Sequence, residues 1–170
     1  RQMCIRDSAN IYLDGNNLLG RATEIKLPDV SLIMQEHKAL GMVGKIELPA
    51  GFDKLEGEIK WNSFYQDVMR KTANPWQAVA LQCRSSIDCY NSQGKANQLA
   101  LVTHLTVMFK KNPLGTFKQN ENPEFSSAFG CTYIKQVVDG ETLLELDYMA
   151  NIFRVNGVDQ LSTYRNNIGG

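Results

Sequence analysis

The clearest fold signal in the sequence is the stretch Tyr133-Ile134-Lys135-Gln136-Val137-Val138-Asp139-Gly140-Glu141-Thr142-Leu143-Leu144-Glu145-Leu146. Two runs rich in apolar and β-branched residues, 133–138 and 142–146, flank the dipeptide Asp139-Gly140. Asp-Gly accepts the positive φ angles of a two-residue turn, so this stretch predicts two antiparallel strands joined by a tight hairpin.

A second hairpin of the same kind is predicted near the amino end. Asn10-Ile11-Tyr12-Leu13 leads into Asp14-Gly15 and returns through Asn16-Asn17-Leu18-Leu19. Residues 22–27 continue as a strand that stops at Pro28, because proline has no N–H for a sheet ladder. Two hairpins therefore frame the chain.

Two internal segments alternate between apolar and polar side chains. Within residues 55–61, one face carries Leu55, Ile59 and Trp61, and the other carries Glu56, Glu58 and Lys60. Such alternation is typical of a half-buried antiparallel strand. Residues 98–110 alternate in the same way, although their second face is only partly polar.

Helical signals are fewer. Ser63 and Gln66 have the spacing of a capping box, and an apolar helical stripe follows until Asn74-Pro75. A shorter helix is expected from about Val158 to Arg165. We therefore predict a mainly β protein of two packed antiparallel sheets, a sandwich or barrel, with one flanking α-helix.

Length and charge limit the possible functions. A chain of 170 residues, 43% of them hydrophobic, fits one globular domain. Eighteen basic and eighteen acidic residues give no net charge, which argues against a dedicated nucleic-acid-binding or membrane-surface protein. No apolar stretch is long enough to span a bilayer. Residues 1–8 contain no apolar segment of the kind found in secretory signals, so we expect no such signal there.

The four cysteines do not form a recognisable pattern. Cys83 and Cys89 lack a second close pair, so a zinc site is disfavoured. We expect free structural thiols, with a Cys83–Cys89 disulfide and a metal site as the alternatives.

No motif for catalysis stands out. His37 and His104 have no Cys, Asp, Glu or second His at metal-ligand spacing, and His104 falls in a predicted strand. Cys131 lacks a nearby histidine signal, and Gly41-Met42-Val43-Gly44 has neither the glycine count nor the helix of a nucleotide-binding loop. We expect no enzymatic activity, no cofactor and no metal.

Two sequence patterns each allow a functional interpretation and a structural one. Glu56 and Glu58 form a possible carboxylate pair, or a solvated strand face flanked by Lys54 and Lys60. Basic and aromatic residues near 109–118 suggest nucleic-acid contact, or simply an exposed strand end, which we prefer. The residues of this second pattern are Phe109, Lys110, Lys111, Phe117 and Lys118.

Two long stretches are rich in turn residues. Residues 35–54 contain Gly41, Gly44, Pro49 and Gly51, and residues 113–123 contain Gly115 and two asparagines. Loops longer than about 12 residues in a compact domain are usually functional or flexible.

The carboxyl end carries a family resemblance. The runs Val138 to Asp147, Asn156-Gly157-Val158-Asp159-Gln160-Leu161 and Arg165-Asn166-Asn167-Ile168-Gly169 closely resemble the end of the major tail tube proteins of contractile-tailed bacteriophages. The tubes of R-type bacteriocins share this pattern. The residues that carry it are Asp139, Gly140, Asn156, Gly157, Val158, Asp159, Arg165, Asn166 and Gly169.

The amino half supports the resemblance. Residues 10–15 resemble the opening hairpin of the family, 25–28 its next strand, and 36–44 its glycine-bearing loop. This chain has Ala39-Leu40-Gly41 where relatives often carry a glycine cluster.

The resemblance implies a structural virion protein. Such subunits form rings of six that stack into a hollow tube inside a contractile sheath, and the tube conducts the genome into the host. It implies contacts with further copies, the sheath, the tape-measure protein and the baseplate, transient passage of DNA, and assembly in the bacterial cytoplasm. The tube of an R-type bacteriocin or related injection machine is the runner-up, and a monomeric ligand-binding β-barrel is less favoured.

Two regions receive specific expectations from the resemblance. Residues 35–54, with Gly41, Met42 and Gly44, are expected to reach the neighbouring ring. A lumen that releases DNA should be neutral or acidic, which makes Glu56 and Glu58 candidates to line it, with the sheath-facing or interface side as the alternative.

Residues 1–8 have no counterpart in the family. Gln2-Met3-Cys4-Ile5-Arg6-Asp7-Ser8 looks like translated adapter sequence, which would leave Cys4 without a biological role. We expect this leader to be disordered or poorly packed. Residues 9–170 are expected to form a single tail-tube domain.

Overall fold

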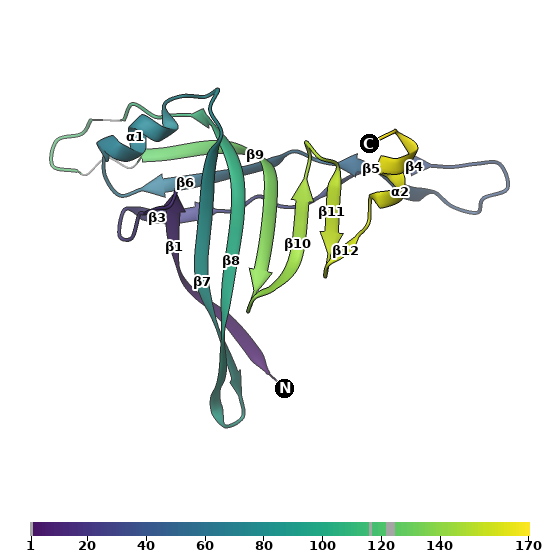
Figure 1. The fold of residues 1–170 in the computed structure, drawn as a ribbon, viewed down its shortest axis with the longest axis horizontal. Coiled ribbons are helices and arrows are strands. Elements are labelled where there is room, and N and C mark those ends of the chain that lie inside the picture. The colour runs from purple at the N-terminus through teal and green to yellow at the C-terminus, as the bar shows by residue number, and fades with distance from the viewer. Residues whose placement is uncertain (1, 116, 122–124) are drawn as a thin grey trace.

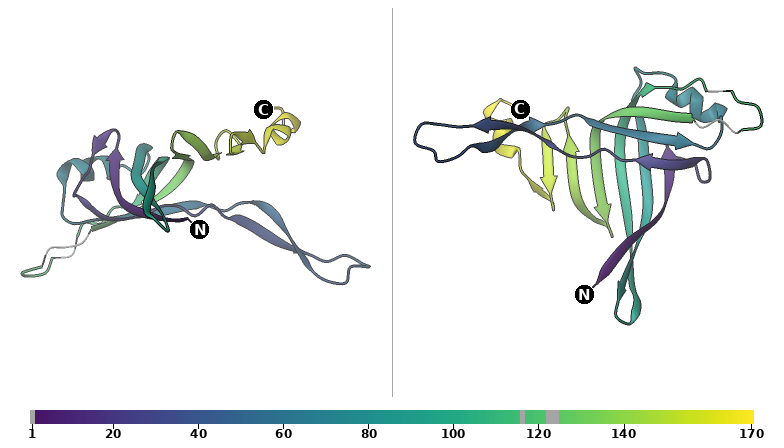
Figure 2. Two further views of the ribbon diagram at one scale, coloured as in Figure 1. Left: turned by 90° about the horizontal axis from the view of Figure 1, so that it is seen from below. Right: turned by 180° about the vertical axis from the view of Figure 1, so that it is seen from behind.

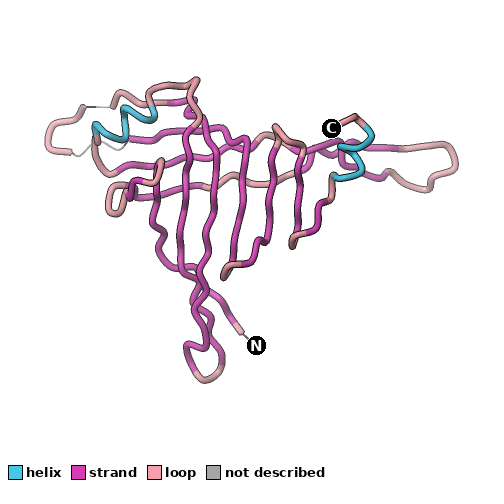
Figure 3. Tube along the Cα trace, viewed as in Figure 1, coloured by secondary structure: helices cyan, strands magenta, loops and turns pink. Residues whose placement is uncertain are grey.

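Antiparallel strands make up most of the chain, as the sequence predicts (Figures 1 and 3). The computed structural model describes residues 2–115, 117–121 and 125–170. The elements are β1 (Met3–Leu13), β2 (Asn16–Asn17), β3 (Ala22–Lys26), β4 (Leu32–His37), β5 (Ile46–Phe52), β6 (Leu55–Trp61), α1 (Gln66–Thr72), β7 (Val79–Asn91), β8 (Gly94–Lys111), β9 (Phe125–Val138), β10 (Glu141–Asp147), β11 (Ile152–Val155), β12 (Val158–Asp159) and α2 (Ser162–Asn167).

Ten of these strands belong to one antiparallel sheet that branches at β9. One edge of β9 pairs with β8, while its other edge pairs first with β6, over 125–131, and then with β10, over 133–138. Figure 1 shows β9 running beside β6 and then bending to run beside β8 and β10. Register shifts between β8 and β9 accompany the bend, as expected where a strand turns the corner between two layers.

The hydrophobic core lies between the two layers. Trp61 of β6 and Phe129 of β9 are almost fully buried, and the Phe129 ring meets that of Phe109 edge-on at 5.9 Å between centroids. The Trp61 indole N–H donates to the Ser127 hydroxyl at 3.1 Å, which satisfies the one polar atom of that side chain inside the core. Helix α1 closes one end of the core with Val68.

Both predicted Asp-Gly hairpins are present. Asp14 and Gly15 have φ angles of 48° and 80° between β1 and β2, and Asp139 and Gly140 have 49° and 82° between β9 and β10. The predicted strand over 55–61 is β6, with alternate residues buried, and the strand over 98–110 lies within β8. Local alternation and turn residues therefore identified these strands correctly.

The layering differs from the expected pair of sheets. The two layers belong to one branched sheet, and the described strands do not close into a barrel. The second sheet contains only β4 and β5, which form a ribbon that extends away from the rest of the chain (Figure 2). Much of the turn-rich stretch 35–54 is thus an antiparallel ribbon. Of the other long stretch, 113–123, residues 116, 122 and 123 lie outside the described part of the chain.

The helices begin later than the sequence predicts. Helix α1 begins at Gln66 with Tyr65 at the N-cap and no side-chain cap, so the predicted Ser63 capping box is wrong. The end of α1 before Asn74-Pro75 is confirmed. Residues 158 and 159 form β12, and α2 starts only at Ser162.

The cysteines also differ from expectation. Cys4 and Cys89 lie opposite each other in β1 and β7 and form a disulfide, so the expectation of four free thiols is wrong for this pair, and Cys83 has no part in it. Cys83 and Cys131 are free and buried. Residues 3–8, expected to be disordered or poorly packed, extend β1 because β7 offers them a partner strand. The origin of this leader stays a prediction.

The close packing of β6 on β9 generates a stability prediction. A Cβ at Gly57 would meet the Phe129 ring and would lie 2.5 Å from the Lys26 carbonyl oxygen. We expect Gly57→Ala to lower the free energy of unfolding by about 1–3 kcal/mol, the usual cost of overpacking. Chemical denaturation measures it.

Gly130 provides the matched control, because it pairs with Glu56 on the neighbouring strand and nothing lies within 4 Å of its added Cβ. Gly130→Ala should leave stability unchanged or slightly raised. Equal effects of the two substitutions would contradict this account of the packing.

Candidate assembly surfaces

No group of three or more His, Cys, Asp or Glu side chains is placed to hold a metal ion in the part of the chain that the structure describes. No helix there is long and apolar enough to cross a membrane. The surfaces of the described residues offer the functional candidates.

The first surface is the tip of the β4–β5 ribbon, residues 38–45. Gly41 adopts φ 87° in the turn, and the Met42 N–H donates to the Ala39 carbonyl at 3.1 Å. Leu40 and Val43 are fully exposed, at 106% and 108% of the reference area. The structure thus places Gly41, Met42 and Gly44 together on a projecting tip with two uncovered apolar side chains.

The second surface is the outward face of β6. Glu56 forms ion pairs with Lys54, at 3.2 Å, and with Lys110. Hydrogen bonding from Lys110, and next from Lys54, lowers the pKa of Glu56 below its usual range. Glu58 accepts a hydrogen bond from Ser126 instead. The two carboxylates share a face, but the charge of Glu56 is balanced by nearby ammonium groups, whereas the hydroxyl that donates to Glu58 is neutral.

The basic and aromatic residues near 109–118 do not form a stacking surface. Phe109 is buried in the core, and Lys110 is paired with Glu56. Phe117 is exposed, and Lys118 pairs with Glu121 at 3.6 Å. The hypothesis of nucleic-acid contact through Phe109 is therefore wrong, because alternation placed that ring on the inner face.

The third surface gathers two of the segments that carry the resemblance. The turn Asp139-Gly140 joins β9 to β10, and the turn Asn156-Gly157 joins β11 to β12, with φ angles of 50° and 80° for the latter pair. Because β10 pairs with both β9 and β11, the two turns lie at the same end of the sheet (Figure 1). Corresponding turn residues 17 positions apart in the sequence, such as Asp139 and Asn156, thus lie along one end of the sheet.

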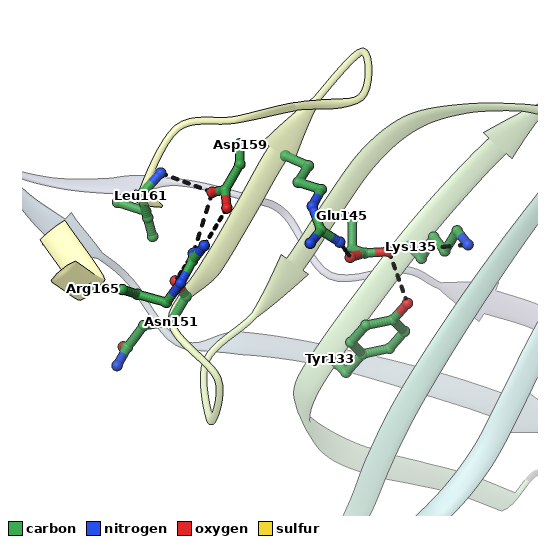
Figure 4. Close-up of polar contacts among 8 residues, drawn as sticks. Tyr133, Lys135, Glu145, Asn151, Asp159, Leu161 and Arg165 are labelled. Carbon is green, nitrogen blue, oxygen red and sulfur yellow. Dashed lines mark hydrogen bonds and ion pairs between the residues drawn. The ribbon is translucent and has the colours of Figure 1, made fainter. Parts of the chain in front are cut away.

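The signature residues Asp159 and Arg165 form a polar clip at the carboxyl end (Figure 4), whereas Val158 is exposed in β12. The Arg165 guanidinium donates to both carboxylate oxygens of Asp159 and, at 2.9 Å, to the Asn151 carbonyl. The Leu161 N–H donates to Asp159 at 3.0 Å. Helix α2 has no buried residue, so these bonds rather than apolar packing hold it to β12. Gly169 follows with φ 81°, and its N–H donates to the Asn166 carbonyl.

This clip has an electrostatic signature. Hydrogen bonding from Arg165, and next from the Leu161 N–H, lowers the pKa of Asp159. The same pair raises the pKa of Arg165. Both side chains are therefore charged at neutral pH.

A row of polar side chains crosses the face of the sheet that points away from the core. The sequence patterns did not predict this row. Cross-strand pairing aligns Gln82, His104, Lys135, Glu145, Arg154 and Asp159. Glu145 accepts from Arg154 at 2.6 Å and from the Tyr133 hydroxyl at 3.3 Å (Figure 4). The only sequence signal was the polar half of each alternating strand, which does not reveal register.

His104 belongs to this row and has no metal-binding neighbours among the described residues. Burial, and next the nearby charges of Lys135 and Arg84, lower its pKa. The interpretation of His104 as a strand residue is confirmed, and His37 ends β4 at the base of the ribbon tip.

The main sheet ends in two unequal edges. On one side β2 pairs only with Tyr12 and Leu13, so no described strand pairs with residues 3–10 of β1 on that edge. On the other side the two-residue strand β12 is the last. Exposed strand edges invite pairing with another chain.

Comparison with known proteins identifies relatives over nearly the whole chain. The model of the family described as "Phage tail tube protein FII" matches residues 6–169. The tail tube protein of Escherichia phage P2 is 28% identical over 164 residues, which covers 94% of each chain. The major tail tube protein of Serratia phage KSP20 is 24% identical over 149 residues, 86% of this chain and 84% of that protein.

Solved structures share the fold. A cryo-EM structure of the PVC sheath-tube complex of an extracellular contractile injection system, in the extended state, matches with a TM-score of 0.54 and 10% identity. The match covers 76% of this chain and 87% of that one. The sheath/tube terminator of the same system matches with a TM-score of 0.52 and 9% identity, over 76% of this chain and 92% of that one.

The clip at Asp159 generates a pH prediction. Its folded-state pKa is lowered, so the stability that it contributes is present above the unfolded pKa of about 3.9 and is lost as pH falls through the folded value. We expect Asp159→Asn to lower the melting temperature at pH 7, and we expect this deficit to be smaller at pH 2.5, which lies below the unfolded pKa. Thermal unfolding monitored by circular dichroism across pH measures this.

Asp29→Asn is the control, since Asp29 is exposed and has no ion pair among the described residues. It should melt like the wild type at both pH values. A deficit of Asp159→Asn that persists undiminished at pH 2.5 would argue against a charge-based clip.

Proposed function

Because the chain belongs to the phage tail tube protein FII family, we propose that six copies form a ring and that such rings stack into the hollow tube of a contractile tail. The chain is a structural tail tube subunit and a component of the virion, without enzymatic activity. The family match over residues 6–169 is the observation that carries this function. In this role the tube conducts the genome into the host.

The open sheet supports ring formation. The free edge of β1 and the edge at β12 are different surfaces at opposite ends of the same sheet. Contacts between two different surfaces are head-to-tail, and such contacts close into a ring when the rotation per subunit divides a full turn. Pairing between copies would also satisfy backbone groups that a lone subunit leaves exposed.

The partners follow from the same assignment. The solved complex with the same fold is described as a sheath–tube complex, so a tail sheath around this tube is the first expected partner. Tape-measure and baseplate proteins are expected at the tube's interior and end, and DNA passes without specific binding. Assembly takes place in the bacterial cytoplasm.

A tube of a contractile injection machine is the second candidate function. The fold shared with the extracellular contractile injection system supports it. Neighbouring genes for a capsid and a terminase favour the phage tail, whereas their absence beside sheath and baseplate genes favours the injection machine.

The ribbon tip is assigned to contacts between rings. Its projection from the body and its uncovered Leu40 and Val43 support this, because apolar side chains so exposed are normally covered in an assembly. Glu56 and Glu58 stay our candidates for the lumen, since carboxylates repel DNA phosphates, and the ion pairs of Glu56 reduce that repulsion.

Assembly itself is the direct test of the function. Purified protein should form rings or tubes at high concentration, because the exposed edges and the apolar tip are covered only in an assembly. Negative-stain imaging and sedimentation measure it. A stable monomer across protein concentration and salt would reject the proposal.

The ribbon tip gives a sharper test. Valine at Gly41 must adopt φ near 87°, which a β-branched residue disfavours, so Gly41→Val should distort the tip and suppress tubes while leaving folded subunits or single rings. Gly20→Val is the matched control, because Gly20 has a similar φ of 77° and open space around it but lies outside the ribbon tip. If Gly41→Val tubes form as readily as wild type, the tip does not join rings.

A further inference from the structure

An open groove of about 890 Å³ lies at the end of the sheet that carries the Asp139-Gly140 turn and the Asn156-Gly157 turn. The second layer, built on β3 and β6, covers the opposite end of the main strands and leaves this one open (Figure 1). The groove is lined by Leu99, Val138, Asp139, Glu141, Thr142, Leu143, Asn156 and Gly157. Leu143 remains 45% exposed there, so the groove has an apolar surface that nothing in the described chain covers.

Backbone hydrogen bonds fix the shape of this groove. The Asn156 N–H donates to the Leu143 carbonyl at 3.0 Å, and the Asp139 N–H donates to the Ala100 carbonyl at 2.8 Å. Each turn is thereby tied to the strand beside it. A groove with walls fixed in this way is preorganised to receive a ligand segment.

The rim of the groove is acidic. Asp139 and Glu141 are both exposed, and neither has an ion-pair partner among the described residues. An apolar floor with two free carboxylates at its rim fits a partner that presents apolar side chains next to a basic one.

The ribbon tip has that chemistry. Residues 38–45 contain no acidic side chain, and the Lys38 ammonium has no ion-pair partner in the described chain, whereas Lys45 pairs with Glu36 at 3.2 Å. Leu40 and Val43 are the most exposed large apolar side chains of the described residues. Tip and groove lie far apart within one subunit, so a subunit cannot fill its own groove (Figures 1 and 2).

We propose that the groove between the Asp139-Gly140 and Asn156-Gly157 turns is the receptor for the ribbon tip of a second copy of this chain. Leu40 and Val43 pack against Leu99 and Leu143, and Lys38 faces Glu141. The inference rests on the proposed function, which places the second copy in the neighbouring ring. It gives the turns at Asp139 and Asn156 a role in assembly beyond joining strands.

Charge exchange tests the pairing. Lys38→Glu and Glu141→Lys each place like charges at the interface, and each should raise the subunit concentration needed for half-maximal tube formation by roughly tenfold. The double variant restores opposite charges and should assemble close to wild type. Asp29→Lys is the control for the change in net charge, because Asp29 is exposed, has no ion pair among the described residues and lies outside groove and tip.

Cross-linking provides a second measurement that does not depend on weakened assembly. Under mild oxidation, Leu40→Cys combined with Leu143→Cys should give covalent oligomers in tubes and none in dilute subunits. Leu40→Cys combined with Met149→Cys, which is exposed outside the groove, should not. Circular dichroism of each variant establishes that it folds.

The outcomes separate this inference from the function. If wild-type protein forms no rings or tubes, the proposed function fails. If tubes form but both single charge variants assemble like wild type, or the double variant does not recover, or the Leu40–Leu143 pair does not cross-link, the groove is not the receptor. Intact tubes of Glu141→Lys that no longer bind sheath protein would assign the groove to the sheath and overturn the inference.

Discussion

One strand edge that serves two partners determines the architecture. The edge of β9 away from β8 pairs with β6 before Thr132 and with β10 after it. Since β6 and β10 cannot occupy the same place, β9 must bend, and the bend turns one sheet into two crossed layers with Trp61 and Phe129 between them. The core, the open groove at the far end and the free sheet edges all follow from this division.

The division of β9 between two layers also places the groove, the ribbon and the polar row on different parts of the subunit. The crossed layer covers only one end of the long strands, so the other end keeps its groove, and the ribbon grows from the covering layer rather than from the main sheet. The polar row at Lys135, Glu145 and Arg154 lies on the remaining face, where no layer packs. A subunit with different surfaces on its edges, ends and faces is suited to directional assembly.

Local features of the fold were predictable from sequence, and non-local ones were not. Asp139-Gly140 identified its hairpin because the turn depends on two adjacent residues. The bend of β9 depends on strands 70 residues apart, and no local pattern marks it. Ser63 matched a capping box only in spacing, since the helix starts where Val68 can reach the core. The signature residues were found by resemblance, but the meeting of Asp139, Asn156 and Gly157 at one groove required the register of β10.

The ribbon of β4 and β5 contains none of the buried core residues of the chain, and Pro49, opposite Met34, cannot donate to its ladder. Two-stranded ribbons without a packed face are marginally stable in water. We therefore expect the tip of a free subunit to fluctuate, and docking of the tip would then cost conformational entropy. This entropic cost opposes the association of two free subunits more strongly than the addition of a subunit to an ordered end, because an ordered end offers several contacts at once. We therefore expect growth from a template to be faster than assembly that starts from free subunits.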